Sequence, residues 1–391
     1  MIRQAALYLA TTDDIPAARL RVVGHPLAFR AILAAVRAGA RRVAVPAALR
    51  DPALEAALAT SPSAQAAVVW LDGGGLASEP TLILPAAALA AAPALTRLLQ
   101  APPGRVLAES HAVGAPAITA DGSLLAALAP ALGAGAPLAD TLARALKARD
   151  LTLVAGDGWF VRVTDARAAA AAAARLWDGL GSPIDSWLDV ALHRRLSRWV
   201  TRAAVGLGVG PNSITVASGG VGLAAAAAVG RGDVASLVGG LLLYLVAVVL
   251  DHSDGEVARL SLTDSAVGER LDVTVDTVVH TALVLALGQA ALRVAGAGLA
   301  AGIAGAAGVV ASAIVGKQWP PAPTTATNRG LLDALTSRDG FYAMLLLFIA
   351  LRVAAPTLLP ALMVVVAIGT HAYWVARLVL RALRNTALKP K

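Results

Sequence analysis

The sequence of 391 residues has no cysteine, few aromatic residues and little charge. The absence of cysteine excludes disulfides and thiolate metal sites, so any metal must be held by oxygen or imidazole ligands. Only 15% of the residues are charged and 57% are hydrophobic, whereas soluble globular proteins have about 25% charged and about 45–50% apolar residues. This shortage of charge indicates a membrane protein.

The shortage is concentrated in the second half of the chain. Residues 1–180 contain short apolar runs interrupted by charged residues and proline, and the rest contains long stretches with almost no charge. The apolar stretch at the N-terminus is too short for a signal peptide, and Asp13 and Asp14 follow it at once, so we expect the N-terminus to stay in the cytoplasm. No basic patch is interleaved with aromatic residues, so the net charge of +8 does not indicate nucleic-acid binding.

Residues 1–180 alternate candidate strands with candidate helices, which is typical of an α/β domain with a largely parallel sheet. Gly-Ser-Pro at 181–183 ends this domain. The predicted helices include Leu27–Ala38, Pro85–Leu99 and Ala166–Leu176. The predicted strands are Ala5–Ala10, Arg42–Pro46, Ala66–Leu71, Thr81–Leu84, Leu151–Ala155 and Phe160–Val163.

Residues 183–204 are predicted to form an amphipathic helix, because apolar residues recur every three or four positions beside an arginine-rich face. Such a helix can lie in the membrane surface, with Trp187 and Trp199 at headgroup depth. The alternative is an ordinary surface helix of the soluble domain. We favour the membrane surface because a predicted spanning segment follows directly.

Residues 205–391 are predicted to form an α-helical polytopic membrane domain of six transmembrane helices, each near the roughly 20 residues that a crossing needs. Six crossings leave both termini on one side, and the segments predicted to face inward carry most of the basic residues, which places the N-terminal domain and the active site in the cytoplasm. The six spans are 212–230, 235–256, 267–289, 294–316, 339–356 and 358–380. The inward basic residues are Arg194, Arg195, Arg198, Arg202, Arg259, Lys317, Arg329, Arg338, Arg381, Arg384, Lys389 and Lys391, against Arg231, Arg293 and Arg352 outside.

An acidic motif joins two of these spans. Asp251 and Asp254 are three residues apart, and Gly268, Asp272 and Asp276 are spaced by four, so each set lies on one edge of its helix. A short loop between the two helices would allow both edges to face one point. Glycine at 255 and at 268 removes side chains from these edges and allows close approach of a ligand.

Four carboxylates that face one point near a membrane indicate a metal site. Such groups are costly there unless they are paired or metal-bound, and they cannot all stay ionised without cations. Oxygen ligands without sulfur favour Mg²⁺ or Mn²⁺. Two such ions would clamp a pyrophosphate, and a spare carboxylate could accept the proton of an attacking hydroxyl. Ordinary interfacial aspartates are the alternative, and the regular spacing of four aspartates and two glycines disfavours it.

The complete pattern, D-x-x-D-G-x-x-A-R-x8-G-x-x-x-D-x-x-x-D, starts at Asp251 and resembles the signature of the CDP-alcohol phosphotransferase family at every fixed position. Pro211, Asn212 and Thr215 match the family's Pro-Asn-x-x-Thr, and the resemblance covers about residues 183–385. It implies a homodimer in which the four aspartates surround two divalent cations, Asp276 is the general base and CMP leaves. The implied CDP-binding residues are Asn212, Thr215, Asp251, Asp254, Gly255, Ala258, Arg259, Gly268 and Asp272.

Further polar residues carry weaker predictions. Lys317 and Arg377 fall where phosphatidylinositol-phosphate synthases of the family hold the acceptor's phosphate, and Arg338 is a third acceptor-binding candidate. The alternative for all three is a basic residue at the inner membrane interface. His252 is predicted to be a neighbour of the site and not a ligand, and His280 a packed histidine with its hydrogen bonds satisfied.

The N-terminal domain resembles the nucleotidyltransferase fold over Gly24–Arg30 and Ala38–Val45. Such enzymes hold a triphosphate with a glycine-rich loop and nearby basic residues after the first strand. This chain has Leu9-Ala-Thr-Thr-Asp-Asp-Ile-Pro16 instead, and Asp13 and Asp14 would repel phosphates. We therefore expect a domain that has lost catalysis and serves stability, dimer contacts or regulation.

The sequence is compatible with three functions. The first is transfer of a phosphatidyl-type group from a CDP-activated lipid to a polar alcohol or phosphoalcohol, such as inositol phosphate or glycerol phosphate, in phospholipid biosynthesis at the bacterial inner (plasma) membrane. The second is transfer of a soluble CDP-linked head group, such as CDP-inositol, to an alcohol. The third, a divalent-cation transporter, is disfavoured because the aspartates form one cluster and the outer halves of the spans lack acidic partners.

Overall fold

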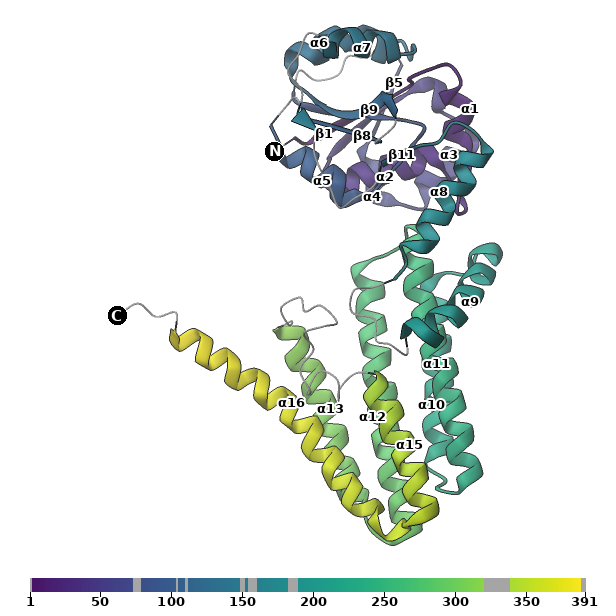
Figure 1. The fold of residues 1–391 in the computed structure, drawn as a ribbon, viewed down its shortest axis with the longest axis vertical. Coiled ribbons are helices and arrows are strands. Elements are labelled where there is room, and N and C mark those ends of the chain that lie inside the picture. The colour runs from purple at the N-terminus through teal and green to yellow at the C-terminus, as the bar shows by residue number, and fades with distance from the viewer. Residues whose placement is uncertain are drawn as a thin grey trace. The chain divides into compact units, whose positions relative to one another are not determined.

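The computed structural model describes residues 2–72, 79–102, 105–109, 112–147, 152–153, 160–181, 189–319 and 338–387. These residues form two compact units, Met1–Gly179 and Leu180–Lys391. Each unit is described by itself (Figure 1).

The N-terminal unit is built on a seven-stranded sheet in the order β10-β8-β9-β6-β1-β4-β5. Its central strand β1 is parallel to β4 and to β6, but β9 is antiparallel to both of its neighbours. The sheet is therefore mixed: four of its six strand pairings are parallel, in line with the predicted largely parallel sheet, and the two pairings of β9 are antiparallel. Only two residues separate β8 from β9 along the chain, and so short a connection joins antiparallel strands. The strands are β1 Gln4–Tyr8, β4 Arg42–Pro46, β5 Val68–Leu71, β6 Thr81–Pro85, β8 Arg105–Glu109, β9 Ala112–Ala120 and β10 Thr152–Leu153.

Two helical layers cover this sheet. Helices α6 (Gly122–Gly133) and α7 (Ala139–Lys147) lie on one face, and α2 (Leu27–Ala38) and α5 (Ala92–Gln100) lie on the other (Figure 1). All residues of β1 are buried, as expected for a central strand that is covered on both faces. Helix α2 occupies the predicted residues and ends at Gly39, whose φ of 117° suits glycine.

The helix predicted over Pro85–Leu99 is shorter than expected. Pro85 is the last residue of β6, and Ala88–Ala90 form strand β7, which pairs antiparallel with β11 (Phe160–Arg162). Helix α5 begins only at Ala92, with Pro93 in its first turn, where proline is favoured because its fixed φ suits a helix start. Propensity alone did not reveal β7, because its alanines suit a helix equally well.

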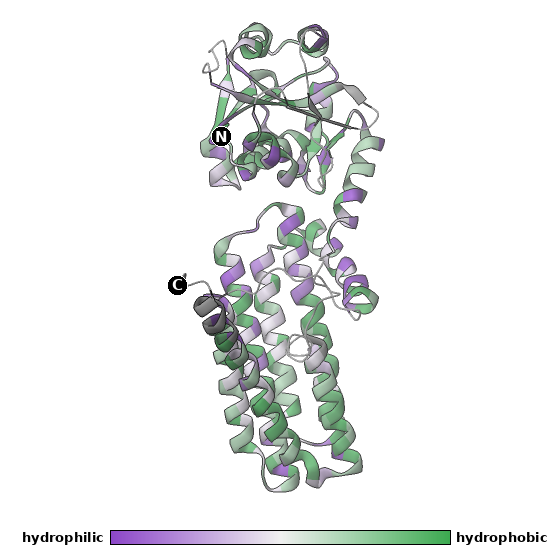
Figure 2. Cartoon of the chain, turned by 60° about the vertical axis from the view of Figure 1, so that its left-hand side comes forward, coloured by the Kyte–Doolittle hydropathy of each residue, from purple (hydrophilic) through white to green (hydrophobic). Residues whose placement is uncertain are grey.

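The C-terminal unit is helical, and hydrophobic residues predominate along its long helices (Figure 2). Five helical segments in the described part are long and apolar enough to cross a membrane. Two shorter elements precede them, the π-helical turn η2 (Asp189–His193) and α9 (Arg194–Leu207). The five spans are α10 (Pro211–Val229), α11 (Val234–Ser261), α12 (Ala266–Ala295), α13 (Leu299–Gln318) and Pro356–Val379, which includes most of α16 (Leu359–Ala387).

The count of six spans is not confirmed. The predicted span 339–356 corresponds to α15 (Arg338–Ala354), which has 17 residues and is too short to be counted with the other five. Two of its side chains, Leu345 and Phe348, are fully buried in the core of this unit. The first part of the predicted amphipathic helix, with Trp187, lies outside the described residues.

Glycines allow two of the spanning helices to approach closely. A β-carbon at Gly302 of α13 would lie 2.7 Å from the α-carbon of Gly288 in α12. Small residues at such contacts are typical of helix pairs in membranes. This contact fixes α12, which carries half of the acidic motif, against the rest of the unit.

Candidate active site

The acidic motif lies where α11 ends and α12 begins. Helix α11 ends at Ser261, and Leu262 has the left-handed φ of 58° that turns the chain. The side chain of Ser265 then caps α12 by accepting a hydrogen bond from the backbone N–H of Gly268 at 3.1 Å. The four residues between the helices therefore reverse the chain and bring the two acidic edges together, as the spacing predicted.

Three of the predicted aspartates converge. One carboxylate oxygen from each of Asp251, Asp254 and Asp272 lies within 4.8 Å of the other two. Asp251 and Asp254 are buried, and Asp272 is half-buried. Carboxylates at such separations repel one another strongly unless a cation neutralises them, and this set of hard oxygen donors fits Mg²⁺ or Mn²⁺.

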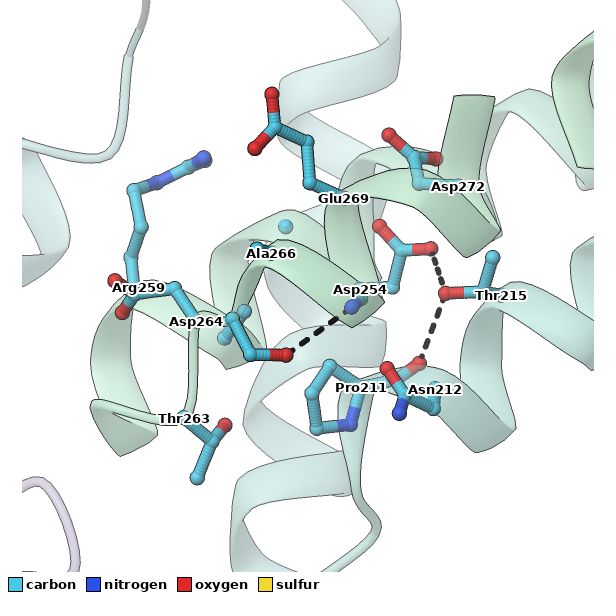
Figure 3. A pocket seen from close by; sticks show the side chains of 14 residues that line it. Pro211, Asn212, Thr215, Asp254, Arg259, Thr263, Asp264, Ala266, Glu269 and Asp272 are labelled. Carbon is cyan, nitrogen blue, oxygen red and sulfur yellow. Dashed lines mark hydrogen bonds between the residues drawn. The ribbon is translucent and has the colours of Figure 1, made fainter. Parts of the chain in front are cut away.

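A polar pocket of about 440 Å³ opens beside these carboxylates (Figure 3). The hydroxyl of Thr215 lies 2.5 Å from Asp254 Oδ2 and 3.2 Å from the carbonyl oxygen of Pro211. A β-carbon at Gly268 would lie 3.2 Å from Asn212 Oδ1, so glycine keeps this wall open. The lining residues include every predicted CDP-binding residue except Asp251, namely Asn212, Thr215, Asp254, Gly255, Ala258, Arg259, Gly268 and Asp272.

Sequence reasoning missed several residues of this pocket. The loop between α11 and α12 contributes Thr263, Asp264 and Ser265, and the first turn of α12 contributes Glu269. A signal was present for Ser265, because a serine directly before the start of an apolar run is typical of a helix N-cap. No pattern in the sequence predicts the conformation of the loop itself.

Residues 209–370, which include this pocket, match the model of the CDP-alcohol phosphatidyltransferase family. The chain carries a CDP-alcohol phosphatidyltransferase domain. This family transfers a phosphate-linked group from a CDP-alcohol to an alcohol, so the domain is of a transferase class that generally uses a divalent metal. A comparison with curated proteins found no match to the chain.

Asp276 of the CDP-alcohol phosphatidyltransferase domain lies outside the group of three. It is four residues after Asp272 on α12 and lines a second cavity of about 520 Å³, which is enclosed by α12, α13, α15 and α16. On α12 the lining extends from Val273 to Val284, which corresponds to about 16 Å along the helix axis. The described residues thus bring together three predicted ligands and place the fourth aspartate at a different cavity.

The walls of this second cavity are largely apolar, and several of their polar groups already have hydrogen-bond partners. His280 Nε2 lies 2.9 Å from the hydroxyl of Tyr244, which confirms the predicted satisfied histidine. Thr277 donates to the carbonyl oxygen of Val273 at 2.7 Å, and Ser312 donates to that of Thr370 at 3.0 Å. The cavity of the CDP-alcohol phosphatidyltransferase domain therefore suits a hydrocarbon better than a sugar.

Of the three acceptor-binding candidates, Arg377 lies beside the end of α13, whose last turn also carries Lys317. Arg377 donates to the hydroxyl of Tyr373 at 2.7 Å and to the carbonyl oxygen of Trp319 at 3.0 Å, and Tyr373 lines the apolar cavity. Lys317 is exposed at the end of α13 and is not among the described residues that line either cavity. The side chain of Arg338 lies outside the described part.

A cluster of polar side chains around His252 of α11, outside the described lining of the polar pocket, was not predicted. His252 Nε2 and His193 Nδ1 lie 2.8 Å and 2.9 Å from the same oxygen of Asp189. All three side chains are buried. His252 is thus a neighbour of the acidic motif, as predicted, but it belongs to a hydrogen-bonded network that residue spacing gave no means of finding.

In the N-terminal unit, residues in and after the end of β1 form hydrogen bonds with other residues of the same unit. The carboxylate of Asp14 accepts from the backbone N–H of Ala10 at 2.6 Å and from Arg162 at 2.7 Å. The carbonyl oxygen of Leu9 accepts from the N–H of Leu138 at 2.8 Å. In open α/β sheets, ligands bind beyond the carboxyl ends of the strands, at the point where the strand order reverses. In this sheet the order reverses between β1 and β6.

Proposed function

We propose that the C-terminal unit transfers a phosphatidyl-type group from a CDP-activated lipid to the hydroxyl of a polar alcohol or phosphoalcohol, such as inositol phosphate or glycerol phosphate, and releases CMP. One observation carries this proposal: Asp272 lines the polar pocket and Asp276, one turn further along α12, lines the apolar cavity. A nucleotide suits the first space and a hydrocarbon chain suits the second. A reactant with both parts would have its phosphates beside this turn of the helix.

In the proposed reaction, Asp251, Asp254, Asp272 and Asp276 would hold two Mg²⁺ or Mn²⁺ ions, and this metal pair would supply positive charge beside the pyrophosphate and the leaving nucleotide. The residues around the polar pocket bind and orient the CDP group, and Gly255 and Gly268 leave room for it. Asp276 accepts the proton of the acceptor hydroxyl. The acceptor oxygen then bonds to the phosphorus that carries the lipid, and the bond from that phosphorus to CMP breaks.

The second candidate reaction reverses the roles, so that a soluble CDP-linked head group such as CDP-inositol is transferred to an alcohol. The apolar character of the cavity beside Asp276 favours it, because a lipid acceptor would bring its hydroxyl to the proposed base from that side. The two reactions differ in which substrate carries the hydrocarbon.

The test offers the purified chain in lipid nanodiscs a matrix of CDP-alcohols and acceptors, and quantifies CMP. CMP release from a CDP-lipid with a polar acceptor supports the first reaction, and release from a soluble CDP-alcohol with a lipid alcohol supports the second. The absence of CMP release from every pair, while the same protein reconstituted in sealed proteoliposomes transports Mn²⁺, would overturn both in favour of a cation transporter.

We further propose that residues 1–180 form a nucleotidyltransferase-like domain without catalytic activity, joined through an amphipathic helix at 183–204 to the membrane domain at 205–391. The contacts of Asp14 support the loss of activity, because its carboxylate takes the backbone N–H of Ala10 that a phosphate would need. The full chain incubated with CTP and polyol phosphates is expected to release no pyrophosphate. Measurable release would refute this assignment.

We also propose a homodimer in the bacterial inner (plasma) membrane, with the N-terminal domain and the active site in the cytoplasm. The chain has no cysteine, so a single introduced cysteine reports its own location. With an impermeant thiol reagent on intact spheroplasts, Arg231→Cys between α10 and α11 is expected to react, and Ser63→Cys in the N-terminal unit only after permeabilisation. The reverse pattern would invert the topology.

A further inference from the structure

The segment that precedes the first span is fastened to the back of α11 by buried polar contacts. Asp189 in η2 contacts His252 and His193 through one carboxylate oxygen, and the other ring nitrogen of His193 lies 3.1 Å from the hydroxyl of Tyr342 in α15. These contacts link η2, α11 and α15. They involve residues up to 149 positions apart in the sequence.

A second set of contacts lies one helical turn further along α11. The side chain of Glu256 is fully buried, and its carboxylate accepts from Arg194 at 2.9 Å, from Ser197 at 2.9 Å and from Thr201 at 2.7 Å. All three donors lie on α9. A buried charge needs such partners, because removing one of them leaves the desolvation of the carboxylate uncompensated.

Both sets act on the face of α11 that is opposite to the active site. With about 3.6 residues per turn, His252 and Glu256 lie on one side of the helix, and Asp254 and Ala258 lie on the other. The pocket lining agrees, since Asp254 and Ala258 contact the polar pocket whereas His252 and Glu256 are absent from its described lining. The helix is therefore held from behind at the turns that carry Asp251 and Asp254.

These two sets of contacts matter because they hold the part of α11 that carries Asp251 and Asp254, and the carboxylates of the acidic motif repel one another. Asp251, Asp254 and Asp272 converge within 4.8 Å, and before a cation binds their repulsion pushes the end of α11 away from α12. On the active-site side, the hydrogen bond from Thr215 of α10 to Asp254 helps to hold this turn of α11.

We propose that Asp189 and Glu256 are positioning residues for the metal site: they hold the Asp251–Asp254 turn of α11 in the geometry that binds divalent cations. The proposal rests on the metal-dependent function proposed above. Partners that orient metal ligands without touching the metal typically change metal affinity by about 10–100-fold when they are removed.

The experiment measures Mn²⁺ binding to the purified full chain by electron paramagnetic resonance, independently of turnover, and the Mg²⁺ concentration for half-maximal CMP release. Asp189→Asn and Glu256→Gln keep the shape of each side chain and remove its charge. Each is expected to raise the Kd for Mn²⁺ by about 10–100-fold. CMP release should recover largely at saturating Mg²⁺, because no group that touches the reactants has changed.

Ser218→Ala is the matched control. Ser218 is buried and donates to the carbonyl oxygen of Ala247 in α11 at 2.9 Å, so its loss weakens a contact with the same helix without touching the network. The control is expected to lower the melting temperature and leave Mn²⁺ affinity unchanged. Thr201→Ala, which removes one donor to Glu256 and no charge, gives a milder form of the expected defect if the charge variants do not fold.

Two outcomes would contradict the proposal. If the network variants melt at lower temperature but bind Mn²⁺ like the unmodified chain, the network has only a structural role. If the unmodified chain itself binds no Mn²⁺, the proposed metal site fails and this inference fails with it. The two failures are distinguishable, because the first appears only in the variants and the second appears before any substitution is made.

Discussion

Asp276→Asn separates proton transfer from substrate binding. The substitution preserves the size of the side chain and removes its ability to accept a proton. Asp276 lies outside the group of three converging carboxylates and outside the described lining of the polar pocket, so CDP binding should be largely retained at saturating Mg²⁺, which offsets the loss of one of the four proposed metal ligands. A positioned general base contributes about 10²–10⁴-fold to a rate, which corresponds to about 3–5 kcal/mol in the activation free energy.

The assay is single-turnover CMP release at saturating Mg²⁺, together with CDP binding measured by calorimetry. We expect the rate to fall by about 10²–10⁴-fold with CDP affinity changed by less than about fivefold, which is within about 1 kcal/mol. Asp272→Asn is the matched control one turn away on the same helix. It belongs to the converging group and lines the pocket, so it should weaken both CDP binding and turnover.

Normal turnover by Asp276→Asn would refute the assignment of Asp276 as the base. Loss of CDP binding as large as that of Asp272→Asn would refute the separation of roles along α12. Both results are readable from the same two measurements. The melting temperature of each variant confirms that the compared samples are folded.

Three further predictions follow from other features. Chelation of divalent cations should abolish CMP release, and added Mg²⁺ should restore it; turnover without a divalent cation would refute the metal site. Burial raises the pKa of Tyr8 above its ordinary value near 10, so the neutral phenol is favoured in the fold and its contribution to stability, present below pH 10, is lost as the pH rises further. Unfolding of the N-terminal unit is followed by circular dichroism at increasing pH. At neutral pH, Tyr8→Phe should lower the free energy of unfolding by about 1 kcal/mol, because the hydrogen bond to Pro116 is lost. Above pH 10 the variant should lose stability less steeply than the unmodified chain, and an unchanged slope would show that ionisation of Tyr8 is not the cause. Gly302→Ala should destabilise the membrane unit by about 1–3 kcal/mol, because its methyl group meets Gly288 of α12, whereas Gly239→Ala, which meets nothing within 4 Å, should not; equal melting temperatures would refute the close packing.

Local spacing predicted the parts of the molecule that depend on local geometry. The three- and four-residue separations of the aspartates placed Asp251, Asp254 and Asp272 on facing helix edges, and the structure brings them together. Helix α2 was predicted to the residue, because its apolar period ends at a glycine that the following turn requires. These features need no knowledge of distant contacts.

Features that depend on pairing between distant segments were not predictable. The direction of β9 follows from its short connection to β8, and neither strand was recognised in the alanine-rich and proline-containing sequence. The contact between Asp189 and His252 joins residues 63 positions apart, and no period in either segment indicates it. The predicted span 339–356 extends two residues beyond Ala354, where helix α15 ends just before Pro356.

The single helical turn that separates Asp272 from Asp276 bears on a general difficulty of lipid chemistry. A nucleotide does not dissolve in hydrocarbon, and a lipid chain does not dissolve in water. Four residues of α helix span about 6 Å, and over that distance the lining changes from the polar pocket to the apolar cavity. Two reactants of opposite solubility can therefore meet at this turn while each keeps most of its surface in the solvent that suits it.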